Sequence, residues 1–381
     1  MADREPIQIL GAGLSGLTAG IVLARAGRRV VIHDLRADSG ARFSGDFQGI
    51  ENWTSPTDFF DEMRAWGIDT GGFEATAMRA IDVVGTDDRS VRIASDRIAF
   101  RLVRRGVHAG SLDQGLKADA LRAGVELRCR SRSDPAGCRI IATGPRRTTG
   151  IVRAELFDTD HPDQATLQFN QALSPGAYTY FFVVGGVGLI ATVLLRRERD
   201  VDAYLDATIA GYERRHPALK RFNRRRITGA GGFAMGRRYK EEGRRYVGEA
   251  AGLQDCFMGF GIRSAITSGF LAAQELLHGP AGHDYEQAVR RQLRPLQVAS
   301  VANRLVIDVS GSAGLAVLLR AWTWHQASTG DGLRFIARLY RHSVLHELIY
   351  RAFGRRILTA PEGPDVARGL SYLRFRDNKT P

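Results

Sequence analysis

The hydrophobic pattern at the start of the chain predicts a strand, a helix and a second strand. The short apolar run Ile7–Leu10 predicts the first strand. An apolar-periodic stretch then continues to Ala26, and Gly27 is suited to end a helix there. Val30–Asp34 is a second apolar, β-branched run, and it ends in an acid. The chain therefore opens with a strand–turn–helix–strand unit.

The middle of the chain contains a long segment without charge, residues 164–195. Two β-branched and aromatic runs, Tyr178–Val184 and Leu189–Leu195, stand on either side of Gly185-Gly186-Val187-Gly188, which predicts a hairpin. The central glycines and the strand-like composition favour a buried sheet over a membrane span. Such a sheet would form the floor of an apolar substrate cavity or simply part of the core.

The C-terminal region, residues 283–381, contains a predicted amphipathic helix over Asp331–Phe353. Its apolar positions are Leu333, Ile336, Leu339, Tyr340, Val344 and Leu348, and its basic positions are Arg334, Arg338, Arg341 and His342. A basic amphipathic helix either lies on an anionic membrane or caps the core of its own protein, and the sequence leaves both interpretations open. Val301–Leu319 is a poor membrane span because Arg304 and Asp308 interrupt it.

Composition excludes several classes of protein. The chain has 381 residues, 44% of them hydrophobic, with a mean hydropathy of −0.19. These values exclude a disordered tail and a polytopic membrane protein, and the length suits about two or three domains. Cys129, Cys138 and Cys256 form no CxxC pair, so neither a disulfide scaffold nor a cysteine zinc site is expected. The histidines lack metal-ligand spacing, so we expect no metal.

The net charge is +13, and it is concentrated in two segments. Residues 214–245 hold 12 Lys or Arg against two acids, and residues 283–381 hold 15 against eight. A localised basic surface suits an anionic partner, which is a phosphate-bearing lipid, a membrane surface or a nucleic acid. Of these we expect the lipid or membrane surface and no nucleic-acid partner. A solvated arginine-rich face is the alternative. Met1–Pro6 does not resemble a signal peptide, so we expect a cytoplasmic location, with peripheral attachment to the inner membrane face left open.

The turn between the first strand and the helix, Gly11-Ala12-Gly13-Leu14-Ser15-Gly16, matches a dinucleotide-binding motif. Gly11 permits a tight turn, Gly13 lets the backbone approach a pyrophosphate, and Gly16 lets the helix pack on the strand. The amides at the helix start would hold the phosphates at the positive end of the helix dipole. Asp34 can accept hydrogen bonds from ribose hydroxyls. The N-terminal position favours FAD over NAD, and a coincidental glycine turn is the alternative.

A second glycine loop opens another predicted helix, Arg263–Leu277. The short apolar run Tyr246-Val247 is followed by Gly248-Glu249-Ala250-Ala251-Gly252 and then by Gly259-Phe260-Gly261-Ile262. An acid at position 249 could bind sugar or ribityl hydroxyls, and the amides near residue 261 could face a ring carbonyl. An ordinary strand–loop–helix connection is the alternative.

Together, these motifs resemble the geranylgeranyl reductase family, part of the FAD enzymes related to p-hydroxybenzoate hydroxylase. The resemblance covers residues 5–280 and rests on five motifs. They are the glycine turn that includes Gly20; Arg42–Asp46; Leu102–Arg105 together with Leu112-Asp113 and Leu116; Ser174–Tyr178; and Gly248–Ile262. The chain departs from the family at three places. Glu249 replaces the usual aspartate, Tyr180–Val183 replaces an aromatic-Pro strand end, and Ile141–Pro145 replaces the Ala-Asp-Gly segment of many related hydroxylases.

The resemblance implies an α/β fold with a discontinuous Rossmann-type FAD-binding domain, an inserted β-sheet substrate domain and a helical C-terminal region. Segments 5–40, 98–150 and 244–280 would build the FAD-binding domain, and segments 41–97 and 151–243 the substrate domain. From the motifs and the resemblance, the candidate FAD-binding residues are Gly11, Gly13, Leu14, Ser15, Gly16, Asp34, Arg42, Ser44, Gly45, Arg105, Thr143, Gly144, Gly248, Glu249, Gly259, Gly261 and Ile262. The candidate substrate residues are Trp53, Tyr178, Tyr180 and Phe182, and Cys256 is a candidate proton donor or substrate contact.

The function expected from this pattern is that of an FAD-dependent oxidoreductase. Our leading hypothesis is reduction of a C=C bond in a large apolar substrate, a prenyl or lipid-like chain, by hydride from the flavin. A specific prenyl substrate does not follow from the sequence. The alternatives are a flavin monooxygenase that hydroxylates an apolar substrate and a non-redox flavin-dependent cyclase or isomerase. The electron donor is either NAD(P)H or ferredoxin, since the sequence shows no separate NAD(P)H motif.

Overall fold

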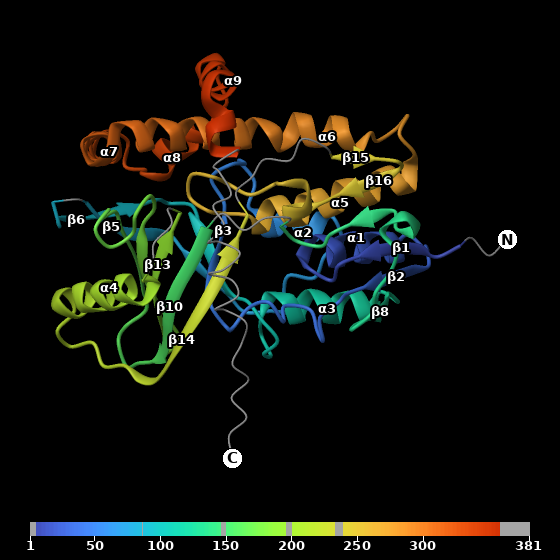
Figure 1. Cartoon of the computed structure of the whole chain (residues 1–381), viewed down its shortest axis with the longest axis horizontal. Helices are drawn as coiled ribbons and strands as arrows, with labels where there is room; N and C mark the ends of the chain where they lie inside the picture. The colour runs from blue at the N-terminus through green and yellow to red at the C-terminus, as the bar shows by residue number, and fades with distance from the viewer. Residues whose placement is uncertain (1–4, 86, 146–149, 196–199, 233–238, 359–381) are drawn as a thin grey trace.

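The computed structural model describes residues 5–85, 87–145, 150–195, 200–232 and 239–358. It contains two large sheets, a small third sheet and a C-terminal group of helices, which confirms the predicted fold class. Figure 1 shows the two large sheets in different halves of the molecule, with the long helix α7 (Arg294–Thr329) extending along the same side of both.

The N-terminal half is built on a six-stranded sheet with the order β15-β16-β9-β1-β2-β8. In that order, the strands are Lys240–Glu241, Arg244–Tyr246, Ile140–Ile141, Ile7–Leu10, Val30–His33 and Glu126–Arg128. All neighbouring pairs except β15 and β16 are parallel. The helices α1 (Leu14–Arg25), α3 (Leu112–Arg122) and α5 (Ile262–His278) share one core with this sheet. The predicted N-terminal strand–helix–strand unit is confirmed, because β1 and β2 flank α1 and pair in parallel.

The other half is built on a seven-stranded sheet with the order β14-β10-β13-β12-β11-β5-β6. In that order, the strands are Phe222–Gly231, Gly150–Asp158, Val187–Leu194, Thr179–Val184, Gln164–Gln168, Ala80–Val84 and Ser90–Ala94. Helix α4 (Val201–Arg215) packs on this sheet through its apolar side. The predicted hairpin is confirmed: β12 and β13 pair across Gly185 and Gly186, whose φ values of 56° and 80° favour glycine.

A three-stranded antiparallel sheet connects the cores of the two halves. It consists of β3 (Phe47–Glu51), β7 (Phe100–Arg104) and β4 (Ala75–Met78), and helix α2 (Phe59–Ala65) follows β3. On β3, Phe47 packs into the core of the seven-stranded sheet, whereas Ile50 packs into the core of the six-stranded sheet. Two short 3₁₀ helices lie next to strands of the six-stranded sheet: η1 (Pro135–Gly137) precedes β9, and η2 (Gly248–Ala251) follows β16.

The C-terminal helices are α6 (Tyr285–Gln292), α7, α8 (Leu333–Tyr340) and α9 (Val344–Leu358). The prediction of one helix over residues 331–353 is therefore wrong. Arg341 has extended backbone after α8, and the Ser343 hydroxyl accepts a hydrogen bond from the His346 amide at the start of α9. The break lets α8 bury its apolar side in the core of the seven-stranded sheet while α9 turns to pack on α7. Residues 359–381 of the predicted C-terminal region lie outside the described residues.

Residues 301–319, which the sequence predicts to be a poor membrane span, lie within helix α7. Among the described residues, α7 is the one helix long and apolar enough to cross a membrane by length and composition, and 11% of its most apolar window is buried. Its two interrupting charges neutralise each other, because Arg304 Nε donates to Asp308 Oδ2 at 2.9 Å. Gly311, with φ 58° and ψ −148°, kinks the helix. Length and composition alone do not place α7 in a membrane.

Candidate functional site

The first glycine loop is tightly packed at two glycines and open at the third. A Cβ at Gly11, where φ is +107°, would lie 2.3 Å from the carbonyl oxygen of Ala142. A Cβ at Gly16 would lie 2.0 Å from the carbonyl oxygen of Gly11. Gly13, the N-cap of α1, has φ −78°, and no described atom lies within 4 Å of a Cβ placed there. The fold thus requires glycine at positions 11 and 16, and the space at Gly13 fits a closely approaching pyrophosphate.

Asp34 lies beside the same loop. Its Oδ2 accepts a hydrogen bond from the Ala12 amide at 2.7 Å, and its Oδ1 accepts one from the Arg36 amide at 2.7 Å. These bonds fix the carboxylate next to the start of α1, where no side chain caps the helix. A carboxylate has about four lone-pair sites, so Asp34 retains acceptor capacity. Its bond to a ribose hydroxyl stays a prediction.

The second glycine motif packs directly against the first. A Cβ at Gly248 would lie 2.9 Å from Ser15 Oγ, and a Cβ at Gly269 in α5 would lie 2.2 Å from the carbonyl oxygen of Ser15. Leu14 and Ile262 are buried at the starts of α1 and α5. The absence of side chains at 248 and 269 therefore lets two helix starts, far apart in the sequence, meet at one edge of the six-stranded sheet.

Arg42 and Glu249 form an ion pair near these helix starts. Arg42 Nη1 donates to Glu249 Oε2 at 2.5 Å, and Arg42 Nη2 also donates to the carbonyl oxygen of Ala230. A Cβ at Gly144, which follows Thr143 after β9, would lie 3.5 Å from Arg42 Nη1. The structure thus gathers four of the candidate cofactor residues. Any contact of Glu249 with a ribityl chain would have to share its carboxylate with Arg42.

Arg105 points into the protein. It donates to both carboxylate oxygens of Asp113, at 2.8 and 2.9 Å, and its guanidinium lies 3.9 Å from the ring centre of Phe43. Its carbonyl oxygen accepts a hydrogen bond from the Gly45 amide at 3.0 Å, and the neighbouring Ser44 amide donates to a side chain within the same segment. Arg105 therefore holds the Arg42–Asp46 segment in place from inside, and its predicted contact with FAD remains untested.

The candidate substrate residues form aromatic and hydrogen-bond contacts between the loop before α5 and the seven-stranded sheet. The Trp53 ring meets the Phe260 ring edge to face, with centres 4.9 Å apart. The Tyr178 hydroxyl donates to the carbonyl oxygen of Met258 at 2.5 Å. Tyr180 stacks on Phe182 with ring centres 4.9 Å apart. All four belong to, or pack against, the core cluster under this sheet, so the structure shows an aromatic wall beside the loop.

Cys256 lies on the buried side of the loop between η2 and α5. Its amide donates to Ser300 Oγ in α7 at 2.7 Å, and burial raises the pKa of its thiol to about 12, with Asp255 adding to the effect. The thiol therefore stays protonated near neutral pH and is a weak acid there. On the other side of the same loop, Gly259 has φ +78° and Gly261 is the N-cap of α5.

Sequence reasoning missed a small, partly open cavity beside this loop, which both polar and apolar side chains line. Its walls include Glu51, the last residue of β3, together with Asp255 and Tyr340. Tyr340 donates to Asp255 Oδ2 at 2.6 Å, whereas Glu51 Oε2 has no hydrogen-bond partner among the described residues. The only sequence signal was an acid that ends an otherwise largely apolar strand, which looks like an ordinary strand end.

Many of the cations in the basic segment 214–245 pair with acids of the same protein. Arg221 pairs with Glu155 and Glu213, and Arg226 pairs with Asp202 and Asp206. Lys240 and Arg245 both lie 2.6 Å from Glu275, a buried acid in α5. These pairs explain much of the charge of the segment as part of the fold. Arg237 and Arg238 lie outside the described residues.

Two glycine loops at one edge of a mainly parallel sheet, with a second large sheet beside them, define a dinucleotide-binding α/β fold. No protein-family model and no curated protein sequence matches the chain. Among solved structures, the chain is similar to a geranylgeranyl bacteriochlorophyll reductase-like protein from Thermoplasma acidophilum. The two are 18% identical with a TM-score of 0.66, and the match covers 97% of this chain and 98% of that one.

Two further neighbours have related descriptions. The flavin-dependent brominase Bmp2 is 15% identical with a TM-score of 0.58, covering 92% of this chain and 98% of its own. PqsL from Pseudomonas aeruginosa, described as a probable FAD-dependent monooxygenase, is 13% identical with a TM-score of 0.56, covering 82% and 98% respectively. At these identities the comparisons show a shared fold, and they agree with the fold that the resemblance implied.

Proposed function

We propose that this protein is an FAD-dependent oxidoreductase. The observation that supports it best is the open space at Gly13, next to Ser15 and Gly248, where the two glycine motifs meet. The residues present fit the pyrophosphate of FAD there, through the uncapped amides of α1 and the fixed carboxylate of Asp34. FAD is also named in the descriptions of proteins with this fold. When bound and reduced, FAD supplies a hydride.

The substrate we propose is a large apolar molecule, prenyl or lipid-like, whose C=C bond is reduced. The aromatic wall of Trp53, Tyr178, Tyr180 and Phe182 supports an apolar substrate, because it begins at the loop before α5. The reductase-like description of the Thermoplasma neighbour supports reduction. NAD(P)H or ferredoxin would reduce the cofactor.

A flavin monooxygenase is the second candidate, because the descriptions of PqsL and Bmp2 name oxidative flavin chemistry on the same fold. A non-redox cyclase or isomerase is the third. The deciding experiment is mass spectrometry of lipids from cells with and without the protein. Reduction adds about 2 mass units and hydroxylation about 16, whereas a cyclase changes retention without changing mass. A product with added oxygen would refute the reductase proposal.

We also propose that the protein is cytoplasmic and attaches to an anionic membrane surface from that side. Large apolar side chains are exposed on α7 and α9, with Val309 87%, Val344 77% and Trp324 71% exposed. Figure 1 shows α9 projecting away from the body of the molecule beside α7. Exposed arginines accompany these side chains, among them Arg320 and Arg338. Apolar insertion combined with basic attraction is the usual basis of peripheral membrane binding.

A further inference from the structure

The cavity beside the loop before α5 is lined by polar atoms that have no partner among the described residues. They are Glu51 Oε2, Trp53 Nε1, Thr54 Oγ1 and Gln297 Oε1. Glu51 is 7% exposed and Gln297 is 4% exposed, so both side chains are largely shielded, while the cavity itself is partly open to solvent. The cavity measures about 20 Å³, which is room for one water molecule with two to four polar partners. The four atoms include both donors and acceptors, as such a water requires.

Burial favours the protonated form of Glu51. It raises the pKa of Glu51 to about 7, although Arg263 in α5 and a hydrogen bond with the backbone of Glu51 lower it, and Asp255 adds a smaller rise. Arg263 forms its ion pair with Glu62 and not with Glu51, because its Nη2 lies 2.8 Å from Glu62 Oε1. The other buried acid, Asp255, has its hydrogen bonds satisfied: it accepts from the Tyr340 hydroxyl, the Ser300 hydroxyl and two loop amides. Burial also raises the pKa of Asp255, but of these two buried acids Glu51 is the one with a carboxyl oxygen, Oε2, that has no hydrogen-bond partner among the described residues.

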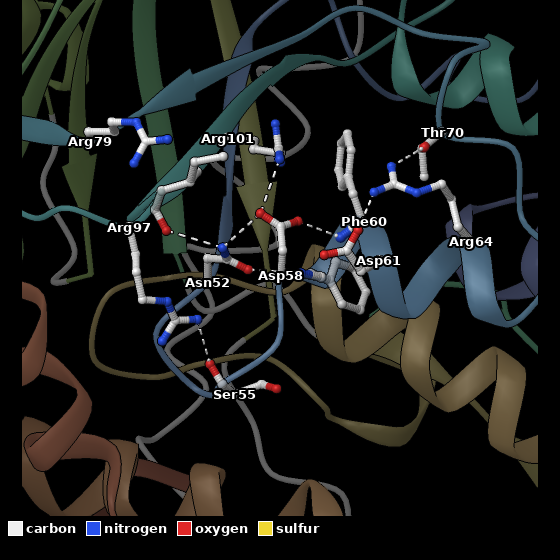
Figure 2. Close-up of polar contacts among 12 residues, drawn as sticks. Asn52, Ser55, Asp58, Phe60, Asp61, Arg64, Thr70, Arg79, Arg97 and Arg101 are labelled. Carbon is white, nitrogen blue, oxygen red and sulfur yellow. Dashed lines mark hydrogen bonds and ion pairs between the residues drawn. The ribbon is translucent and has the colours of Figure 1, made fainter.

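The residue directly after Glu51, Asn52, is anchored by a hydrogen-bond network with Asp58, and Figure 2 shows this network. Asn52 donates to Asp58 Oδ2 and to the Ile98 carbonyl oxygen, both at 3.1 Å, and accepts from the Phe59 amide. Asp58 caps α2 and also accepts from Arg101 at 3.0 Å. This network fixes the segment that carries Trp53 and Thr54. It explains how polar atoms without partners can be held in place around one small space.

We propose that Glu51 and this cavity form an internal proton-donor site, in which one water carries the Glu51 proton to a substrate held at the Phe260 face of the loop. The inference rests on the proposed function, since it supplies the proton that reduction of a C=C bond needs. One carbon gains the hydride from the reduced cofactor, and the other gains the proton released by Glu51. The π-electron pair forms the new C–H bond to that proton, the cofactor is oxidised by two electrons, and Glu51 regains a proton from solvent.

The first test measures the proton on Glu51 without any turnover. Infrared spectra of the FAD-loaded protein between about pH 5 and about pH 9 should show a carbonyl band of a protonated carboxylic acid that disappears with a midpoint near 7. Glu51→Gln keeps the size and polarity of the side chain and should remove this band. Glu126→Gln, a matched change at an exposed acid, should leave it. A wild-type band that persists in Glu51→Gln, or no such band, would overturn the inference.

The second test measures proton delivery. With a reducible lipid extract, Glu51→Gln should lower turnover about 10²–10⁴-fold, the usual range for loss of a general acid. It should also remove the fall in rate above pH 7 while leaving FAD affinity unchanged. Equal turnover and an equal pH profile in wild type and Glu51→Gln would refute proton delivery. If wild type formed no reduced product, the proposed function would fail, and the infrared titration would still decide whether Glu51 is the proton store.

Discussion

The change Gly13→Trp should block ligand binding at the first glycine loop and leave folding unaffected. Gly13 has φ −78°, which any residue can adopt, and a Cβ there would meet no described atom within 4 Å. A tryptophan would therefore fill the space that we assign to the pyrophosphate without disturbing the chain. By contrast, the positive φ and the 2.3 Å approach to Ala142 at Gly11 make that position unsuitable for such a test.

The expected loss of affinity follows from the hydrogen bonds that the tryptophan would block. Each backbone amide bonded to a charged phosphate contributes about 1.5–3 kcal/mol. Two such amides at the start of α1 contribute about 3–6 kcal/mol, which is a rise in the dissociation constant of about 10²–10⁴-fold. The purified variant should accordingly lack the yellow colour of bound flavin, and titration of the apoprotein with FAD should show weak quenching of flavin fluorescence.

The matched control is Gly137→Trp. Gly137 also has open space around a Cβ, but it lies in η1, before β9, at the opposite edge of the six-stranded sheet from Gly13. This variant should keep FAD and the wild-type melting temperature. If Gly13→Trp binds FAD with normal affinity, the nucleotide assignment is wrong. If Gly13→Trp loses both FAD and its circular dichroism spectrum, the open-space argument is wrong.

Three further outcomes are expected. Asp34→Ala should weaken FAD binding by about 1–3 kcal/mol, measured by the same titration. Unchanged affinity would show that the ribose hydroxyls hydrogen-bond to another residue. Because burial raises the pKa of Glu51 from 4.5 to about 7, the folded protein binds the extra proton, and stability falls as pH rises through this window. As the pH rises from about 5 to about 8, the unfolding free energy of Glu51→Gln should therefore increase relative to that of wild type by up to about 3 kcal/mol. If urea denaturation shows a difference in unfolding free energy that does not change with pH, this reasoning is contradicted. The protein should sediment with anionic liposomes, be released by high salt and ignore neutral ones. Val309→Asp with Val344→Asp should reduce that sedimentation while FAD absorbance stays intact, and equal binding to neutral liposomes would remove the electrostatic argument.

The fold of the N-terminal unit could be predicted because its signals are local. The apolar run at Ile7–Leu10, the glycine turn and the acid at Asp34 each follow from short-range backbone requirements, and β1, α1 and β2 appear where the pattern predicts them. The hairpin at Gly185-Gly186 was predictable for the same reason, since positive φ at both turn residues selects glycine.

The burial of side chains and their hydrogen-bond and ion-pair partners could not be predicted, because they depend on residues far apart in the chain. The apolar period over residues 331–353 correctly predicted helical structure, yet the helix ends at Tyr340, whose hydroxyl donates to Asp255, and a second helix begins at Val344. The cationic run 214–245 looked like a surface for anions, yet acids from β10, α4 and α5 neutralise many of its charges.

The sequence by itself determined the class of fold and the position of the first glycine loop, because hydrophobic period and glycine geometry act over a few residues. Only the tertiary structure decided which polar groups are buried and which are satisfied. Glu51 acquires its raised pKa from burial beside the loop, against the opposing charge of Arg263, and distant segments bring Asp255 and Gln297 to the same cavity. Desolvation and Coulomb interactions depend on distance in space, and distance in space is set by the packing of the whole chain.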